Sequence, residues 1–421
     1  MASAGSLNGS YRSLFRNRNF VALWAGQLVS VLGDYLYFLA IPIMVNRLTG
    51  STLMVGISTI TSALPMLLFG PIAGVFVDRW DRKTTMIAAD ILRGMLVLLC
   101  LLVKTADQVW IYYVAGFLMS CVSRFFFPAQ TAALPIILSN EKDLLPANGL
   151  MQVVVTAGML AGPALAGVSI GLWGSWTAFS IVSLSFFLSA AAISTMSIPP
   201  TRRQAINGKT IGNPLRAVAK EMKTGLVFLF SNRILTPMLV GLMVANLCTG
   251  AITVVWVPYL QKFFQVGAAG LGLVDSAQGI GMLAGGLSLG FLAARMKKIP
   301  LAALCLTLIG LLFMGMGWAP AFSVIVVLAA GIGLVSVPAQ SVVTTILQMV
   351  VPDEKRGRIS SVVNGLATAT ALISMSVAAV FGERIGLRNI YYLCGLINIV
   401  AAVITIFIGR EPEAAPYRVL D

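Results

Sequence analysis

Long apolar stretches follow one another along almost the whole chain, and each contains 20 residues or more. A helix needs about 20 such residues to cross the hydrocarbon core of a bilayer, which is about 30 Å thick. A transmembrane barrel would instead show short strands of alternating hydrophobicity, and the sequence has no such pattern. We therefore predict an all-α integral membrane protein with twelve transmembrane helices. The expected helices cover residues 20–43, 53–77, 84–103, 109–138, 148–172, 176–197, 234–263, 269–295, 299–318, 321–350, 359–384 and 388–409.

The scarcity of charge supports this fold class. Charged residues make up only 10% of the 421 residues, whereas a soluble domain carries about 25%. So few charges cannot cover a water-exposed surface, so most of the surface must face lipid. The formal net charge of +14 then indicates orientation in a membrane rather than nucleic-acid binding.

Lys and Arg residues are concentrated in alternate connections between the expected helices. With the N-terminus inside, 22 of them fall in cytoplasmic segments and five in external ones, while Arg93 and Arg124 fall within helices. The positive-inside rule predicts that both termini lie in the cytoplasm. We expect a multi-pass protein of the cell membrane, with a cytoplasmic N-terminal segment at 1–19 and a cytoplasmic tail at 410–421.

The pattern of helices indicates an internal duplication. Two sets of six expected helices, at 20–197 and 233–409, are separated by a basic stretch at 198–232 that we place in the cytoplasm. A shift of 216 residues brings Gly74 onto Gly290, and other positions match at the same shift. We therefore predict two pseudo-symmetric six-helix bundles, an arrangement that transporters often build around a site near the bilayer midplane.

The connection after the second expected helix reads Gly-Val-Phe-Val-Asp-Arg-Trp-Asp-Arg-Lys, from residue 74 to residue 83. It resembles the GxxxD(R/K)xGRK signature of the major facilitator superfamily, in its usual place between helices two and three. Asp81 stands where that family usually has glycine. The resemblance extends over nearly the whole chain and implies a transporter in which this motif controls conformation. The residues of this motif are Gly74, Asp78, Arg79, Arg82 and Lys83, and we expect Asp90 and Arg93 to support them.

Shorter patches, at 30–34 and 147–150 among others, resemble the drug-efflux branch of the superfamily that includes macrolide exporters. The fifth expected helix also resembles the glycine-proline motif of antiporters in the superfamily. Close packing of small residues would account for the same pattern, because GxxxG spacing is common in membrane helices. The residues concerned are Gly158, Gly162, Pro163 and Gly167.

Among the charged residues inside the expected membrane spans, five stand out: Asp34, Asp90, Arg93, Arg124 and Asp275. A charge in the bilayer is expensive, so such residues usually face the interior and often serve function. Asp90 and Arg93 are three residues apart and share a helix face, so we expect a structural ion pair. Asp275 is expected near the external end of its helix, where it reaches either water or a cavity.

Asp34 is the charged residue that suits proton coupling best. It lies about 20 Å into the first helix by helical rise, and a buried carboxyl favours its neutral form. A proton-coupled exporter needs such an acid, at which proton and substrate exclude one another. Arg124 approximately matches an arginine of another superfamily motif and would modulate Asp34. We take Asp34, Arg124 and Asp275 as proton-coupling candidates, while a structural hydrogen-bonding role for Asp34 and Arg124 stays open.

Several aromatic and polar side chains are candidates for lining a substrate cavity. They are Tyr35, Tyr37, Trp256, Asn246 and Gln278.

Together these features predict a secondary active transporter that exports a drug-like or hydrophobic metabolite by alternating access, driven by protons. Its expected partners are a small-molecule substrate, protons and membrane lipid, without nucleic acid, and we expect a monomer. The chain has no histidine, no phosphate-binding GxxxxGK[ST] loop and no metal-ligand spacing among its five cysteines, so we expect neither an enzyme nor a cofactor or metal. A lysophospholipid or lipid flippase of the same fold is the alternative, and a non-transporting membrane receptor is a further one.

Overall fold

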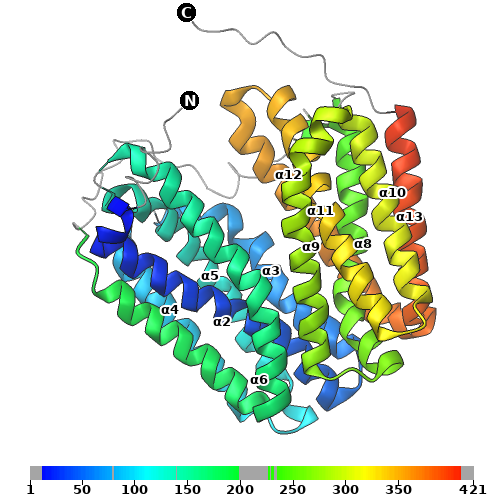
Figure 1. The fold of residues 1–421 in the computed structure, drawn as a ribbon. Coiled ribbons are helices and arrows are strands. Elements are labelled where there is room, and N and C mark those ends of the chain that lie inside the picture. The colour runs from blue at the N-terminus through cyan, green and yellow to red at the C-terminus, as the bar shows by residue number, and fades with distance from the viewer. Residues whose placement is uncertain are drawn as a thin grey trace, which may run out of the picture. The chain divides into compact units, whose positions relative to one another are not determined.

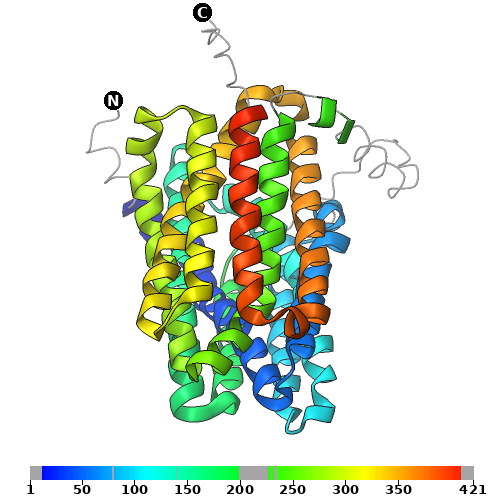
Figure 2. The same ribbon diagram turned by 90° about the vertical axis from the view of Figure 1, so that its right-hand side faces the viewer.

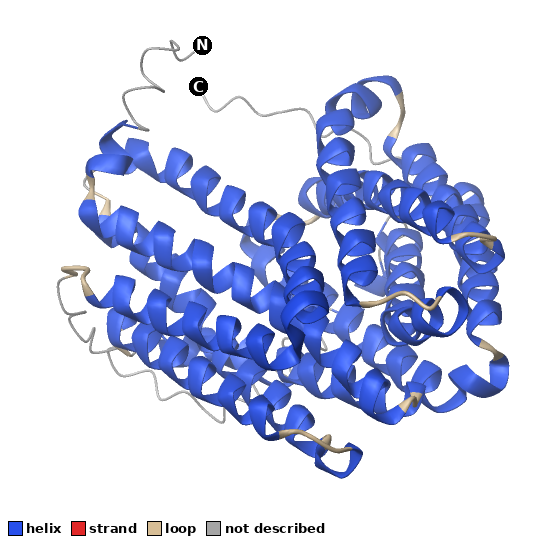
Figure 3. Ribbon diagram, turned by 60° about the horizontal axis from the view of Figure 1, so that its bottom comes forward, coloured by secondary structure: helices blue, strands red, loops and turns tan. Residues whose placement is uncertain are grey.

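The structure of the protein is a computed structural model that describes residues 12–77, 80–138, 140–198, 226–227, 229–231 and 235–408. Figure 3 shows that these residues form helices and connecting loops, without strands. Two compact units can be distinguished, one formed by residues 1–207 with 266–276, the other by residues 208–265 with 277–421.

The first unit contains five long helices (Figure 1). Helix α6 has 51 residues and would be about 76 Å long if it were straight, more than twice the thickness of a bilayer core. Its backbone leaves the helical conformation at Gly174, where φ is 81° and ψ is 173°. This break divides α6 into the two segments expected at 148–172 and 176–197. The helices of this unit are α2 (Arg18–Thr49), α3 (Thr52–Val77), α4 (Arg82–Leu99), α5 (Trp110–Ile137) and α6 (Leu144–Ser194).

The second unit is built from the remaining helices. Figure 2 shows α8 and α13 side by side, with α12 next to them, and α10 packs against α13. Helix α9 is shared, because residues 266–276 at its start belong to the first unit and the rest to the second. The helices are α8 (Leu235–Phe264), α9 (Ala268–Arg295), α10 (Lys298–Trp318), α11 (Phe322–Val350), α12 (Asp353–Ile385) and α13 (Leu387–Ile408).

The all-α membrane class is confirmed. Within the described ranges, ten helical stretches are long and apolar enough to cross a bilayer, with α6 counted once and α9 not among them. Each of the twelve expected segments coincides with a helix or with one half of α6. The count of twelve membrane crossings and the superposition of the two halves stay predictions. The terminal segments and the basic stretch at 198–232 lie almost entirely outside the described residues.

Side-chain caps fix the starts of the helices that carry the charged residues. Asn17 Oδ1 accepts hydrogen bonds from the backbone N–H groups of Asn19 and Phe20, at 3.0 and 3.2 Å, and so caps α2. Asp81 Oδ1 accepts from the N–H of Thr84 at 2.8 Å and caps α4. The φ of Asp81 is −66°, a backbone conformation that does not require glycine. The aspartate found in place of the usual glycine therefore has a capping role.

Helices α2 and α6 approach closely because small residues lie between them. A Cβ added to Gly26 would lie 3.2 Å from Ser189 Oγ, and one added to Gly33 would overlap Ser185 Oγ. Small residues let membrane helices bring their backbones together in this way. The contact fixes the part of α2 that carries Asp34 against the part of α6 beyond Gly174.

Candidate functional site

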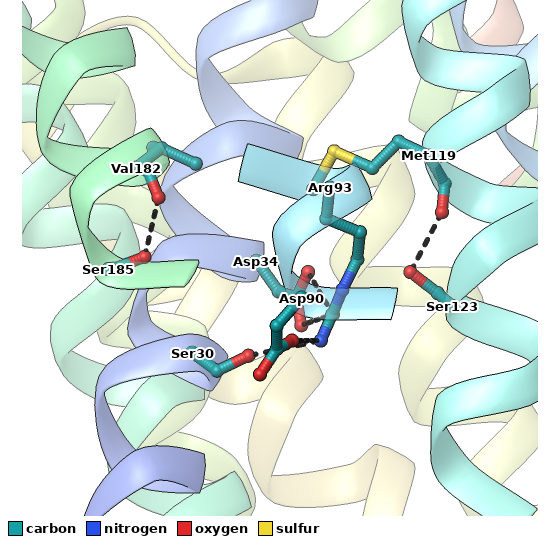
Figure 4. A network of polar contacts seen from close by, with 8 residues as sticks. All are labelled: Ser30, Asp34, Asp90, Arg93, Met119, Ser123, Val182 and Ser185. Atoms are coloured by element: carbon teal, nitrogen blue, oxygen red, sulfur yellow. Dashed lines mark hydrogen bonds and ion pairs between the residues drawn. The ribbon is translucent and has the colours of Figure 1, made fainter. Parts of the chain in front are cut away.

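Two carboxylates of the first unit share one guanidinium. Arg93 Nη1 donates to both carboxylate oxygens of Asp34, at 3.2 and 3.3 Å, and so joins α4 to α2. Its Nη2 forms an ion pair with Asp90 on the same helix and donates to Ser30 Oγ at 3.3 Å. Figure 4 shows the three charged side chains and Ser30 converging between the two helices. We refer to Ser30, Asp34, Asp90 and Arg93 as the charged cluster.

The arginine of the charged cluster is enclosed by aromatic rings. Its guanidinium carbon lies 4.6 Å from the ring centre of Phe126 on α5 and 4.5 Å from that of Phe186 on α6. These distances are within the range of cation–π attraction. The side chain of Arg93 is 3% exposed and that of Asp90 is fully buried, whereas 38% of the Asp34 side chain is exposed. Of the three charged groups, Asp34 is therefore the most exposed.

The spacing of residues along α2 and α4 brings the members of the charged cluster onto the facing sides of these helices. Asp90 and Arg93 are three residues apart on α4, and Ser30 and Asp34 are four apart on α2, so each pair shares a helix face. Gly94 follows Arg93, and a Cβ there would lie 3.0 Å from the ring of Phe187 on α6. Its carbonyl accepts a hydrogen bond from Ser183 Oγ at 2.9 Å, which fastens α4 to α6 beside the cluster.

The expected contact between Asp90 and Arg93 is present, and Arg93 also pairs with Asp34, a contact that the sequence did not predict. The direct partner of Asp34 is Arg93, while Arg124 on α5 interacts with Asp34 electrostatically and forms no ion pair with it. The difference arises because spacing along one helix says nothing about the register between α2 and α4. The contacts of Ser30, Phe126 and Phe186 with Arg93 were not predicted. Of these residues, only Ser30 could have been inferred from the sequence, because it lies one helical turn before Asp34 and shares its helix face.

The glycine-proline segment of α6 packs against α2 and against the start of α9, which belongs to the first unit. A Cβ added to Gly158 would overlap Val31, and one added to Gly162 would overlap Tyr35 on α2. Further along the helix, Gly167 lies against the backbone of Ala268 at the start of α9. The small residues of this segment therefore allow close helix packing. An antiporter role is a separate proposal.

Asp275 lies on α9 close to the same segment. The neighbouring Ser276 donates from its Oγ to the carbonyl of Leu160 on α6, at 2.8 Å. Gly272 likewise lies so close to the carbonyl of Pro163 that a Cβ would overlap it. Asp275 itself is half-buried. Asp34 and Asp275 therefore lie on two helices that both contact the glycine-rich part of α6.

The expected cavity residues occupy different environments. Tyr35 is half-buried beside Asp34, whereas Tyr37 is buried with its ring centre 6.4 Å from that of Phe179, so Tyr37 is a packing residue of the first unit. In the second unit, Trp256, Asn246 and Gln278 are half-buried. The side-chain nitrogen of Asn246 donates to the carbonyl of Leu242 in its own helix, at 2.8 Å.

An apolar pocket of about 210 Å³ lies in the second unit between α8 and α12. It does not include the cavity residues expected from the sequence. Its α8 residues lie at positions i, i+1, i+4, i+5 and i+8, which places them on one helix face. The pocket is lined by Phe230, Leu239, Val240, Met243, Val244, Leu247, Leu366 and Thr370.

The loop motif is described in part. Gly74 lies in α3, while Asp78 and Arg79 are outside the described residues. Lys83 Nζ donates to the carbonyl of Met196, just past the end of α6, at 2.5 Å. A cation near the last carbonyls of a helix is favourable, so Lys83 links the start of α4 to the end of α6.

In sequence, this chain is similar to membrane transporters. Residues 10–415 match the sequence model of a family described as transmembrane secretion effector, MFS_3. The chain is 27% identical to macrolide efflux protein A of Streptococcus pyogenes over 392 residues, which cover 91% of this chain and 94% of that protein. It is 26% identical to the multidrug efflux pump Tap of Mycobacterium tuberculosis over 422 residues, covering 97% and 98% of the two chains.

The fold also matches solved structures. A bacterial homologue of the iron transporter ferroportin, in an inward-facing state, aligns with a TM-score of 0.71 over 94% of this chain and 99% of that one. A bacterial metal transporter aligns with a TM-score of 0.66 over the same shares. Sequence identity is 15% and 14%, so these structures support the helical architecture alone.

Proposed function

Because this chain belongs to the transmembrane secretion effector family of the major facilitator superfamily, we propose that it exports drug-like or hydrophobic compounds from the cell in exchange for protons. The superfamily transports small molecules, and relatives that span almost the whole chain are named for macrolide and multidrug efflux. Alternating access of a central cavity would carry the substrate across the membrane.

The observation that carries the coupling is the exposed carboxylate of Asp34 beside the enclosed guanidinium of Arg93. A charge within a membrane-spanning segment is costly, and an acid there commonly marks a proton or substrate path. Asp34 can hold a proton, or it can remain ionised and pair with Arg93. A substrate that occupied the space beside Asp34 would favour one of these two states, which is the requirement for exchange.

The apolar pocket of the second unit supports a hydrophobic cargo. Its walls offer little hydrogen bonding, because Thr370 is the one polar side chain among its lining residues and donates to Leu366 in its own helix. Such a pocket accommodates the apolar part of a drug-like molecule, and it equally accommodates an acyl chain. A lysophospholipid or lipid flippase therefore remains the second candidate function.

We place the protein in the cell membrane as a monomer with both termini in the cytoplasm, so that the basic connections face inside. In this orientation the substrate enters from the cytoplasm and protons enter from outside. The motif of Gly74 to Lys83 then lies at the cytoplasmic ends of its helices, where it would control conformation without contacting substrate.

Transport by inside-out vesicles tests the proposal. We expect uptake of a radiolabelled macrolide when the vesicle lumen is acidified, and no such uptake when a protonophore collapses the gradient. Vesicles without the protein provide the control. Uptake that is unchanged by the protonophore would exclude proton coupling. Movement of a fluorescent lysophospholipid, without movement of any drug in the panel, would favour the flippase.

A further inference from the structure

Asp90 occupies an unusual position for a residue that only supports a loop. Its side chain is fully buried, and it binds Nη2 of Arg93 while Nη1 of the same guanidinium binds Asp34. Ser189 of α6 also lies close to its carboxylate. When both acids are ionised, two negative charges compete for one positive charge inside the bilayer.

We propose that Asp90 is a positioning residue for proton coupling, which holds Arg93 from the buried side and so sets how strongly the guanidinium opposes protonation of Asp34. This inference rests on the proposed coupling role of Asp34. It assigns Asp90 an effect on the protonation of a residue with which it shares the Arg93 guanidinium and interacts electrostatically.

The effect of Asp90 on the protonation of Asp34 follows from the enclosure of Arg93. The rings of Phe126 and Phe186 flank the guanidinium, and Ser30 occupies part of its remaining hydrogen-bonding surface. Arg93 therefore cannot follow Asp34 toward the exposed side when that carboxyl takes up a proton. A buried cation left without a partner is costly. Asp90 supplies the remaining partner, and protonation of Asp34 becomes easier than it would be with Arg93 alone.

Other polar and charged groups lie near Asp34 and the charged cluster. Arg124 of α5 interacts with Asp34 electrostatically, and Tyr35 is its neighbour on α2. Helix α6 contributes the hydroxyl groups of Ser185 and Ser189 on this side of the bundle. A variant of Asp90 leaves all of these groups in place, so a shift of the Asp34 midpoint in that variant reports the loss of the Asp90 carboxylate.

The experiment measures protonation of Asp34 in two ways on the purified, reconstituted full chain. One is the pH dependence of macrolide exchange across liposomes. The other is the infrared C=O stretch of the protonated carboxyl, assigned to Asp34 by its loss in Asp34→Asn. We expect Asp90→Asn to move both midpoints to lower pH by about one to three units, the usual effect of an uncompensated nearby cation.

A second variant should move the Asp34 midpoint in the opposite direction. Arg93→Lys keeps the charge but loses the fork that reaches both acids, and the ammonium is expected to stay with the fully buried Asp90. Asp34 then loses its cation, and its midpoint should move to higher pH. Ser183→Ala is the matched control, because Ser183 is buried and bonds the carbonyl of Gly94 outside the charged cluster. It should leave the midpoint unchanged.

The outcomes separate this inference from the proposed function. A wild-type protein that shows neither a titrating Asp34 band nor pH-dependent transport contradicts proton coupling itself. A titrating band whose midpoint is the same in Asp90→Asn as in wild type overturns the role of Asp90 alone. If Asp90→Asn does not fold, Arg93→Lys decides the matter, and a midpoint that stays unchanged or moves to lower pH overturns the inference.

Discussion

Gly162 of α6 lies directly against Tyr35 of α2, so closely that a Cβ on Gly162 would overlap the Cβ of Tyr35. Tyr35 follows Asp34 in the sequence, so this contact sets how the acid is held against α6. The glycine that resembles part of an antiporter motif thus also packs the helix that carries the proposed proton site.

We predict that Gly162→Ala destabilises the protein although alanine favours helix formation. The added methyl group must displace Tyr35 or separate α2 from α6, and overpacking of this kind costs about 1–3 kcal/mol. Gly149→Ala is the matched control on the same helix, because a Cβ there meets nothing within 4 Å. The melting temperature of the detergent-purified protein should fall for Gly162→Ala and stay the same or rise for Gly149→Ala. Equal melting temperatures would show that α2 and α6 are less tightly packed than described.

The membrane helices could be predicted because the apolar stretches are long and separated by polar connections. The pair of Asp90 and Arg93 could be predicted for a similar reason, since their spacing of three residues determines that they share a face of α4. Both predictions need only the sequence of a single helix and no knowledge of how helices pack. The division of α6 at Gly174 was also expected, because the apolar stretches at 148–172 and 176–197 are separate in the sequence.

The composition of the charged cluster could not be predicted because it depends on the register between helices. Ser30 and Asp34 come from α2, while Phe126 and Phe186 come from α5 and α6. Many apolar faces in this chain are of similar character, so composition does not select which phenylalanine meets Arg93. Arg124 was the nearest match to a known arginine motif, yet the direct ion pair with Asp34 belongs to Arg93.

We predict that the loop motif affects the rate of transport and leaves substrate preference unchanged. Asp78→Asn removes the acid of the motif, and Lys83→Gln removes the link to the carbonyl of Met196. Either change should reduce efflux of two chemically unlike substrates in the same proportion. Lys142→Gln alters an exposed lysine outside the motif and should have no effect. A changed ratio between the two substrates would mean that the motif contributes to recognition.

We predict that Asp34 faces water during the transport cycle. A cysteine at position 34, in a variant whose five native cysteines are replaced, should react with a charged maleimide, because thiols ionise and react only where water enters. A cysteine at Ser183, which is buried between helices, should remain unlabelled. Labelling is read by mass shift of the intact protein in membranes. Protection of position 34 under all conditions would place its side chain against lipid or in the bundle interior.

The last prediction concerns energy coupling, and it follows from the chemistry of an amide at position 34. Asp34→Asn removes the titrating carboxyl while nearly preserving size, and the amide can still accept a hydrogen bond from Arg93. Proton-driven efflux should then fail, because the variant cannot exchange a proton for substrate. Downhill exchange of labelled for unlabelled substrate should survive, since the helices and the glycine contacts are unchanged. Asp275→Asn is the matched control on α9, and it should retain proton-driven efflux if Asp34 is the essential carrier. Both activities are measured in proteoliposomes containing equal amounts of folded protein. Full proton-driven efflux by Asp34→Asn would exclude that residue as the carrier and leave Asp275 as the next candidate.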